Sequence, residues 1–99
     1  MLHTINKSPF EKSSLQTCLR YADDGSSILL IEDGVYAASK GTEFEKLISS
    51  KNNIKFYVLG PDLDARGLDN SNLITNIEIV DYKGFVKLVA ENEKTQNWL

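Results

Sequence analysis

The sequence has only one cysteine, Cys18, and only one histidine, His3. A single cysteine cannot form a disulfide within the chain, so no covalent cross-link supports the fold. One histidine and one cysteine also fall short of the ligand set that a zinc site needs, and no spaced group of carboxylates makes up the difference. The residue counts therefore exclude a disulfide framework, predict no metal site, and leave Cys18 free for packing or for chemistry.

Long apolar runs and clusters of basic residues are also missing. No run approaches the ~20 apolar residues that cross a bilayer, and the N-terminus lacks the basic start and apolar stretch of a secretory signal. Lysines and arginines are scattered and the net charge is -3, whereas phosphate binding relies on dense positive charge. We therefore expect a cytoplasmic protein that makes no membrane contact and no direct contact with nucleic acid.

The glycines form neither G-x-G-x-x-G nor G-x-x-x-x-G-K-[ST], the motifs that cradle phosphates of nucleotides, and no cofactor is expected. What the chain does contain is an ordinary globular composition, with 41% hydrophobic and 25% charged residues. A chain of 99 residues has apolar material for one core. We expect a single domain that spans residues 1–99.

Four segments are predicted to form strands. Residues 27–33 and 54–60 are nearly unbroken apolar runs, which is typical of strands buried on both faces. Residues 2–6 and 76–80 are weaker candidates, and the segments between the four mostly carry helical spacing. This alternation predicts an α/β fold with a small parallel sheet of about four strands flanked by helices. The last residues, 95–99, follow as a tail.

The helices are located by apolar spacing and by capping residues. A first helix, expected to begin after Ser13, carries one apolar stripe composed of Leu15, Cys18, Leu19 and Ala22. A second helical region runs over 35–50 with a break at Gly41, and Pro61 and Gly67 bound a loop with one helical turn. Asp81 is predicted to cap the last helix. Tyr82, Phe85, Val86 and Val89 fall on one face of that helix, and we expect Tyr82, Phe85 and Val89 to lie in the core rather than to form a binding stripe.

Several single residues invite a functional interpretation beside a structural one. The structural interpretation is preferred for His3, as a hydrogen-bonded histidine, and for Gly34, as a turn glycine at positive φ. Arg66 is expected to pair with a carboxylate of its own loop, Asp62 or Asp64, in preference to reaching across a subunit boundary. Trp98 leaves two alternatives open, because a large aromatic in a polar tail docks on its own domain or is buried in a partner.

Cys18 also has two interpretations. Its place on the apolar stripe of the first helix favours an inert thiol in the core, since free cysteine is among the most buried residue types. A reactive thiol needs a lowered pKa, and the sequence offers only Arg20 as a nearby cation. Local sequence therefore does not establish activation.

Four ordered blocks of the chain resemble the DsrH/TusB family of sulfur-relay subunits, within the wider DsrE-like group. The blocks cover essentially the whole chain: LHTINKSPF at 2–10, LLIEDGVYAA at 29–38, YVLGPDLDARGL at 57–68 and VDYKGFVKLVAENEKTQNWL at 80–99. The resemblance implies a small parallel α/β domain and a heterohexamer with two copies each of three related subunits. The implied partners are DsrE/TusD-like and DsrF/TusC-like subunits and a DsrC/TusE-like sulfur acceptor.

The resemblance also bears on Cys18. In such relays a cysteine thiolate attacks a donor persulfide, keeps its outer sulfur as a persulfide, and yields that sulfur to the next thiol without a cofactor. DsrH-like members of sulfur-oxidising bacteria carry a cysteine in the first helix, and this position aligns with Cys18, whereas TusB-like members of the tRNA-thiolation branch can lack any cysteine. Cys18 is therefore a candidate persulfide carrier, with the core interpretation still open.

Two functions follow from these alternatives. In the first, the chain is a sulfurtransferase subunit that carries sulfur on Cys18, in sulfur oxidation rather than in tRNA 2-thiouridine formation. In the second, it is a non-catalytic assembly subunit, or a subunit of the tRNA relay, and a sister subunit carries the sulfur. Exposure of the Cys18 thiol separates the two.

Overall fold

The computed structural model covers residues 1–99 and contains a five-stranded parallel sheet in the order β4-β3-β2-β1-β5. The strands are β1 (Leu2–Ile5), β2 (Ser27–Leu30), β3 (Lys55–Leu59), β4 (Ile77–Val80) and β5 (Thr95–Trp98). The α/β class and the parallel sheet are confirmed. The strand count was one too low, because β5 lies in the segment expected to be a tail.

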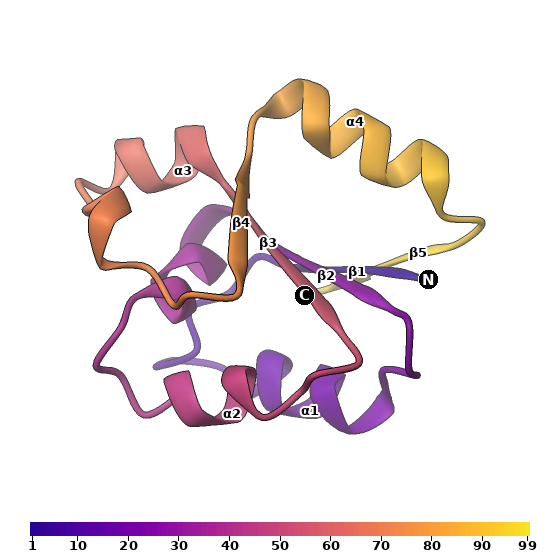
Figure 1. Cartoon of the computed structure of the whole chain (residues 1–99), viewed down its shortest axis with the longest axis horizontal. Coiled ribbons are helices and arrows are strands. Elements are labelled where there is room, and N and C mark those ends of the chain that lie inside the picture. The colour runs from indigo at the N-terminus through magenta and orange to yellow at the C-terminus, as the bar shows by residue number, and fades with distance from the viewer.

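Helices lie on both faces of the sheet (Figure 1). They are α1 (Ser14–Tyr21), α2 (Glu45–Ser49), α3 (Gly60–Ala65) and α4 (Tyr82–Glu91), with two 3₁₀ helices, η1 (Glu32–Ala38) and η2 (Asn70–Asn72). In Figure 1, α1 and α2 lie below the sheet, and α3 and α4 lie above it. None of these helices has the length and hydrophobicity that a membrane crossing requires.

The two apolar clusters of the domain differ greatly in size. One cluster holds 18 buried residues, including Cys18 of α1, Ile48 of α2 and Phe56 of β3. The second cluster holds only three buried residues, Leu2, Leu29 and Leu88. Because apolar burial is the main stabilising contribution, most of the stability of the domain comes from the larger cluster. The layer under α4 is thin and partly open.

The helix ends follow the predicted signals in part. Asp81 caps α4 by accepting a hydrogen bond from the Gly84 amide at 2.8 Å, as expected. Ser13 stands before α1, but its side chain makes no capping hydrogen bond. The expected second helical region is split into η1 and α2, and Gly41 has a φ of 85° in the break between them.

Gly34 is required for a different reason from the one predicted. It does not adopt positive φ; the residue in the left-handed region is Glu32, at a φ of 49°. A Cβ atom at position 34 would instead overlap the carbonyl oxygen of Ile5. The glycine therefore allows η1 to approach the end of β1 closely, which no larger residue permits.

Candidate functional site

Cys18 lies in the larger core cluster, and its exposed fraction is 0%. The thiol is free, and it belongs to the same buried stripe of α1 as Leu15 and Leu19. Burial raises the pKa of the Cys18 thiol to about 12, so the thiol is protonated at neutral pH. Since the thiolate is the nucleophile, this geometry favours the core interpretation of Cys18 over the carrier interpretation in the isolated chain.

His3 and Trp98 join the two ends of the chain. The Nε1–H of Trp98 donates a hydrogen bond to Nδ1 of His3 at 3.1 Å, which assigns the proton of the neutral imidazole to Nε2. Tyr21 of α1 stacks on Trp98 with ring centroids 6.4 Å apart. His3 is therefore a buried, hydrogen-bonded histidine, as predicted. Trp98 docks on its own domain, which decides the alternative that the sequence left open.

Burial lowers the pKa of His3. The positive N-terminal amine lowers it further, whereas Asp23 opposes both effects. The neutral form of His3 is also the form that accepts the hydrogen bond from Trp98, because a protonated imidazole has no free lone pair. Docking of Trp98 and neutrality of His3 are thus coupled.

Arg66 holds together the carboxyl ends of β2 and β3. Its Nε donates to Oδ1 of Asp33 at 2.9 Å and its Nη1 donates to the main-chain oxygen of Asp62 at 3.2 Å. The Asp62 carboxylate in turn accepts a hydrogen bond from the Glu32 amide at 2.6 Å. The predicted ion pair within the loop is wrong in its partner, since the carboxylate that pairs with Arg66 comes from η1. This cluster ties η1 to α3.

The apolar face of α4 is exposed rather than buried. Tyr82, Val86 and Val89 have exposed fractions of 60%, 68% and 41%, and Phe85 is half-buried. The prediction of a core position is therefore wrong for Tyr82 and Val89. The physical reason is that the apolar residues of α4 extend over more of the helix surface than the sheet can cover. Leu88 is the only residue of α4 that is buried.

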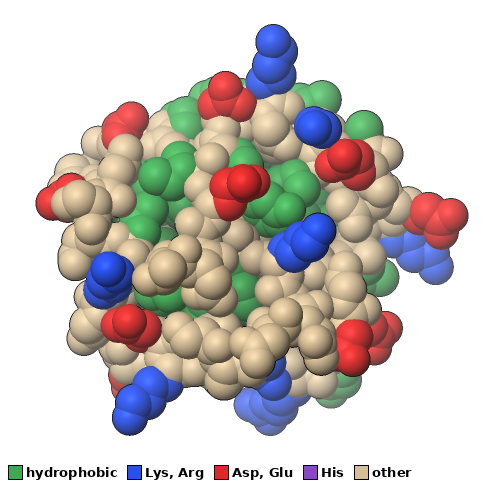
Figure 2. Space-filling model, viewed as in Figure 1, with side chains coloured by type: hydrophobic (Ala, Val, Ile, Leu, Met, Phe, Trp, Pro, Cys, Tyr) green, Lys and Arg blue, Asp and Glu red, His purple; other side chains and the backbone are tan.

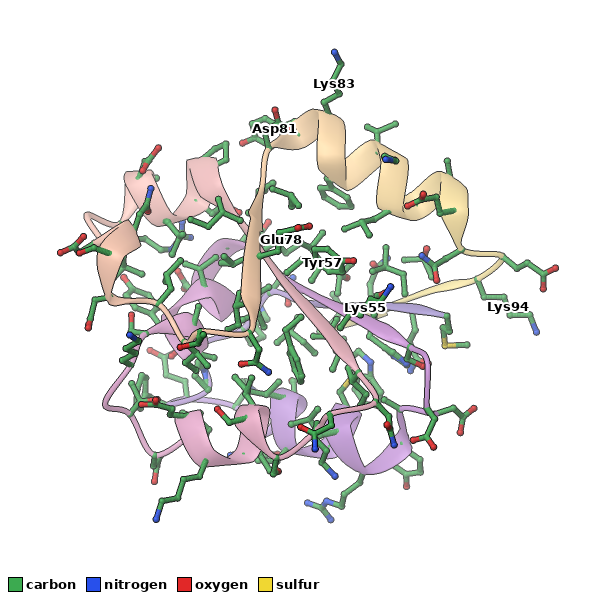
Figure 3. The ribbon with its side chains drawn as sticks, viewed as in Figure 1. Lys55, Tyr57, Glu78, Asp81, Lys83 and Lys94 are labelled. Atoms are coloured by element: carbon green, nitrogen blue, oxygen red, sulfur yellow. The ribbon has the colours of Figure 1, made fainter.

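This α4 face, defined as Tyr82, Phe85, Val86, Val89 and Ala90, contains a shallow hollow of about 330 Å³ lined by the last four. Figure 2 shows hydrophobic side chains at the surface below and around α4, with charged side chains between them. Figure 3 shows Lys83 projecting away from the sheet and Tyr57 and Glu78 on the near face below α4. An apolar face rimmed by charged groups is typical of a protein contact surface.

Tyr57 lies under α4 on the open side of the sheet. Burial raises its pKa, and the negative charges of Glu78 and Glu91 raise it further. A phenol with a raised pKa stays neutral at physiological pH, so its hydroxyl is able to donate a hydrogen bond. The surface below α4 thus combines apolar area with one polar donor.

Known proteins are similar to this chain in sequence and in fold over nearly its whole length. Residues 7–95 match the family described as DsrH like protein. TusB of Pectobacterium parmentieri is 37% identical over 99% of this chain and 100% of its own length, and TusB of Enterobacter sp. strain 638 is 39% identical with the same coverage.

Two solved structures share the fold. The ychN protein of Escherichia coli has a TM-score of 0.80 at 17% identity, with 97% of each chain covered. A protein of unknown function from Methanobacterium thermoautotrophicum has a TM-score of 0.76 at 14% identity, over 97% of this chain and 96% of that one. The family match over residues 7–95 and the full-length similarity to TusB proteins show that this chain belongs to the DsrH/TusB family.

Proposed function

We propose that this chain is an assembly subunit of a cytoplasmic sulfur-relay complex, and that a sister subunit carries the sulfur. The observation that carries the proposal is the exposed α4 face, where Tyr82, Val86 and Val89 are left uncovered by the rest of the domain. Exposed apolar area of this kind costs free energy in water, and a contact with another subunit recovers it. The occupant that we assign to the α4 face is a DsrE/TusD-like or DsrF/TusC-like subunit of the same fold.

Within the family, we assign the chain to the tRNA-thiolation branch. The curated relatives bear the name TusB, whereas the sulfur-oxidation branch was favoured only by the position of Cys18. In the tRNA branch, subunits of this type can lack a cysteine, and a buried Cys18 is compatible with that role. Any link to tRNA is then indirect, because the chain carries a net charge of -3 and no basic patch.

Charges around the α4 face indicate what its partner should offer. Lys83 and Lys87 lie on the polar side of α4 and are exposed. Complementary charges at the rim of an interface speed association and select the partner. We therefore expect acidic side chains on the sister subunit beside its own apolar contact area.

Native mass spectrometry of the chain co-expressed with its sister subunits tests the proposal. We expect a defined hetero-oligomer with the unmodified chain and loss of this chain from the oligomer with Val86→Asp. The control is Lys46→Gln, which changes the net charge by the same single unit at an exposed position of α2. Both variants should retain the thermal stability of the parent, because both positions are exposed. A complex that keeps Val86→Asp as readily as Lys46→Gln contradicts the role of the α4 face.

Sulfur transfer through Cys18 is the second candidate, favoured by the resemblance of the first helix to DsrH-like members. It requires that the complex expose the thiol, because the isolated chain buries it. Intact-mass analysis of the assembled complex after treatment with a persulfide donor separates the two candidates. One added sulfur on this chain supports the carrier, and sulfur on a sister subunit alone supports the assembly subunit.

A further inference from the structure

The C-terminal strand β5 is attached to the domain by few contacts. It pairs only with β1, and three of its four residues are exposed. Two side-chain hydrogen bonds add to the ladder: Thr4 Oγ1 to Asn97 Oδ1 at 2.6 Å, and Trp98 Nε1 to Nδ1 of His3 at 3.1 Å. Terminal elements with little buried area open more readily than the rest of a domain. The docking of β5 thus depends heavily on Trp98.

Trp98 is the only side chain of β5 that is packed against the larger core cluster. Its indole nitrogen is a donor only, so a half-buried Trp98 needs an acceptor nearby. The acceptor is Nδ1 of His3, whose side chain is 3% exposed. Protonation of His3 places a hydrogen on that nitrogen, and two N–H groups then face each other without an acceptor.

We propose that His3, Trp98 and β5 form a pH-responsive latch, in which protonation of His3 releases β5 and uncovers the edge of β1. The device depends only on contacts within this chain and is independent of the proposed relay function. Because the rest of the sheet is held by the larger core cluster, release is expected to be local. The uncovered β1 edge presents unpaired main-chain groups to solvent or to another strand.

The charges that face His3 determine the direction of the response. The N-terminal amine disfavours the protonated form, and Asp23, which follows α1, favours it. The neighbours of His3 in the sheet, Ile28 on β2 and Gln96 on β5, carry no charge. Tyr21 of α1 is the other titratable side chain of the cluster, through its stacking on Trp98.

The sign of the pH dependence follows from these surroundings. Burial lowers the pKa of His3 in the docked state, whereas release of β5 returns it toward the ordinary value of about 6.5. The released state therefore binds more protons, and docking weakens as the pH falls through this value. Docking is complete above about pH 6.5 and is lost progressively below it, toward the lowered pKa of the docked state.

The composition of the chain suits a direct experiment, since His3 is its only histidine and Trp98 its only tryptophan. Fluorescence of Trp98 and amide hydrogen exchange are followed in the full chain between about pH 7.5 and about pH 5. We expect the Trp98 emission to shift to the red with a midpoint below about pH 6.5. Protection of the β5 amides, corrected for intrinsic exchange, is expected to fall about tenfold while β2 and β3 stay protected.

Two variants separate the latch from a general effect of acid. His3→Gln keeps a side-chain acceptor that does not titrate, and it should remove the fluorescence transition. Trp98→Phe removes the donor, and the β5 amides of this variant should be weakly protected at every pH in the range. The latch is overturned if wild-type β5 keeps its protection at low pH. It is equally overturned if His3→Gln shows the same transition, or if β2, β3 and β5 lose protection together.

Discussion

The Nε atom of Arg66 lies 2.9 Å from Oδ1 of Asp33, which joins the end of α3 to η1 across 33 residues of sequence. The Asp33 side chain is 57% exposed, so solvent screens the pair. We expect Asp33→Asn to lower the free energy of unfolding by less than about 1 kcal/mol, and high salt to reduce this effect further. Arg66→Ala should cost more, because it also removes the hydrogen bond to the Asp62 carbonyl. Urea unfolding at low and high salt measures both values, and a large loss for Asp33→Asn at high salt would contradict the assignment.

Gly34→Ala should destabilise the domain by about 3 kcal/mol or more, because the new methyl group meets main chain that cannot rotate away. The comparison position is Gly41, where a Cβ has open space but the φ of 85° is unfavourable. Gly41→Ala should cost about 1–2 kcal/mol, and Gly41→Asn should recover part of that loss, since asparagine tolerates this region. Gly34→Asn should recover nothing. Equal recovery at the two positions in denaturant unfolding would show that φ, and not space, constrains Gly34.

Cys18 should react with iodoacetamide far more slowly in the folded chain than a free thiol does, because its pKa is raised to about 12 and its side chain is fully buried. Cys18→Ser should cost about 1–3 kcal/mol by burying a hydroxyl among apolar side chains. Cys18→Ala buries no polar group and separates this cost from that of the cavity. Alkylation under native conditions at the rate of a free thiol, with little loss of stability in Cys18→Ser, would instead support the carrier.

Two substitutions on α4 distinguish its buried side from its exposed side. Leu88→Ala should lower the free energy of unfolding by about 2–5 kcal/mol, since Leu88 is 7% exposed and belongs to the small core cluster. Val86→Ala, at 68% exposure, should change it by less than about 0.5 kcal/mol. Thermal unfolding of the two variants measures the difference. A large loss for Val86→Ala in the isolated chain would mean that the α4 face is already covered there, by self-association.

The sequence predicted the central strands and the fold class because those strands are buried on both faces and are almost wholly apolar. It did not predict β5, since an edge strand with little burial needs no apolar run, and Thr95–Trp98 carries none. The parallel pairing of β5 with β1 depends on the return of the chain through α4, which no local pattern encodes.

The candidate site was predicted only in part, for a similar reason. The stripe that contains Cys18 correctly indicated a helix, and its apolar neighbours favoured burial. The spacing of Tyr82, Val86 and Val89 indicated an apolar face but not the extent of sheet available to cover it. Arg66 pairs with Asp33, which lies on a different segment, because neighbouring parallel strands bring their carboxyl ends together. The local sequence around Arg66 does not show this proximity.

The pairing of the last strand with the first has a consequence for synthesis. Leu2 and Thr95 are register partners at opposite ends of the sequence. A ribosome releases the N-terminal part of a chain first, so β1 waits for its outer neighbour until translation is nearly complete. Closing so distant a contact is slow and leaves the edge of β1 open in the nascent protein. During that interval, a strand from a chaperone or from another nascent subunit has its best opportunity to compete with β5.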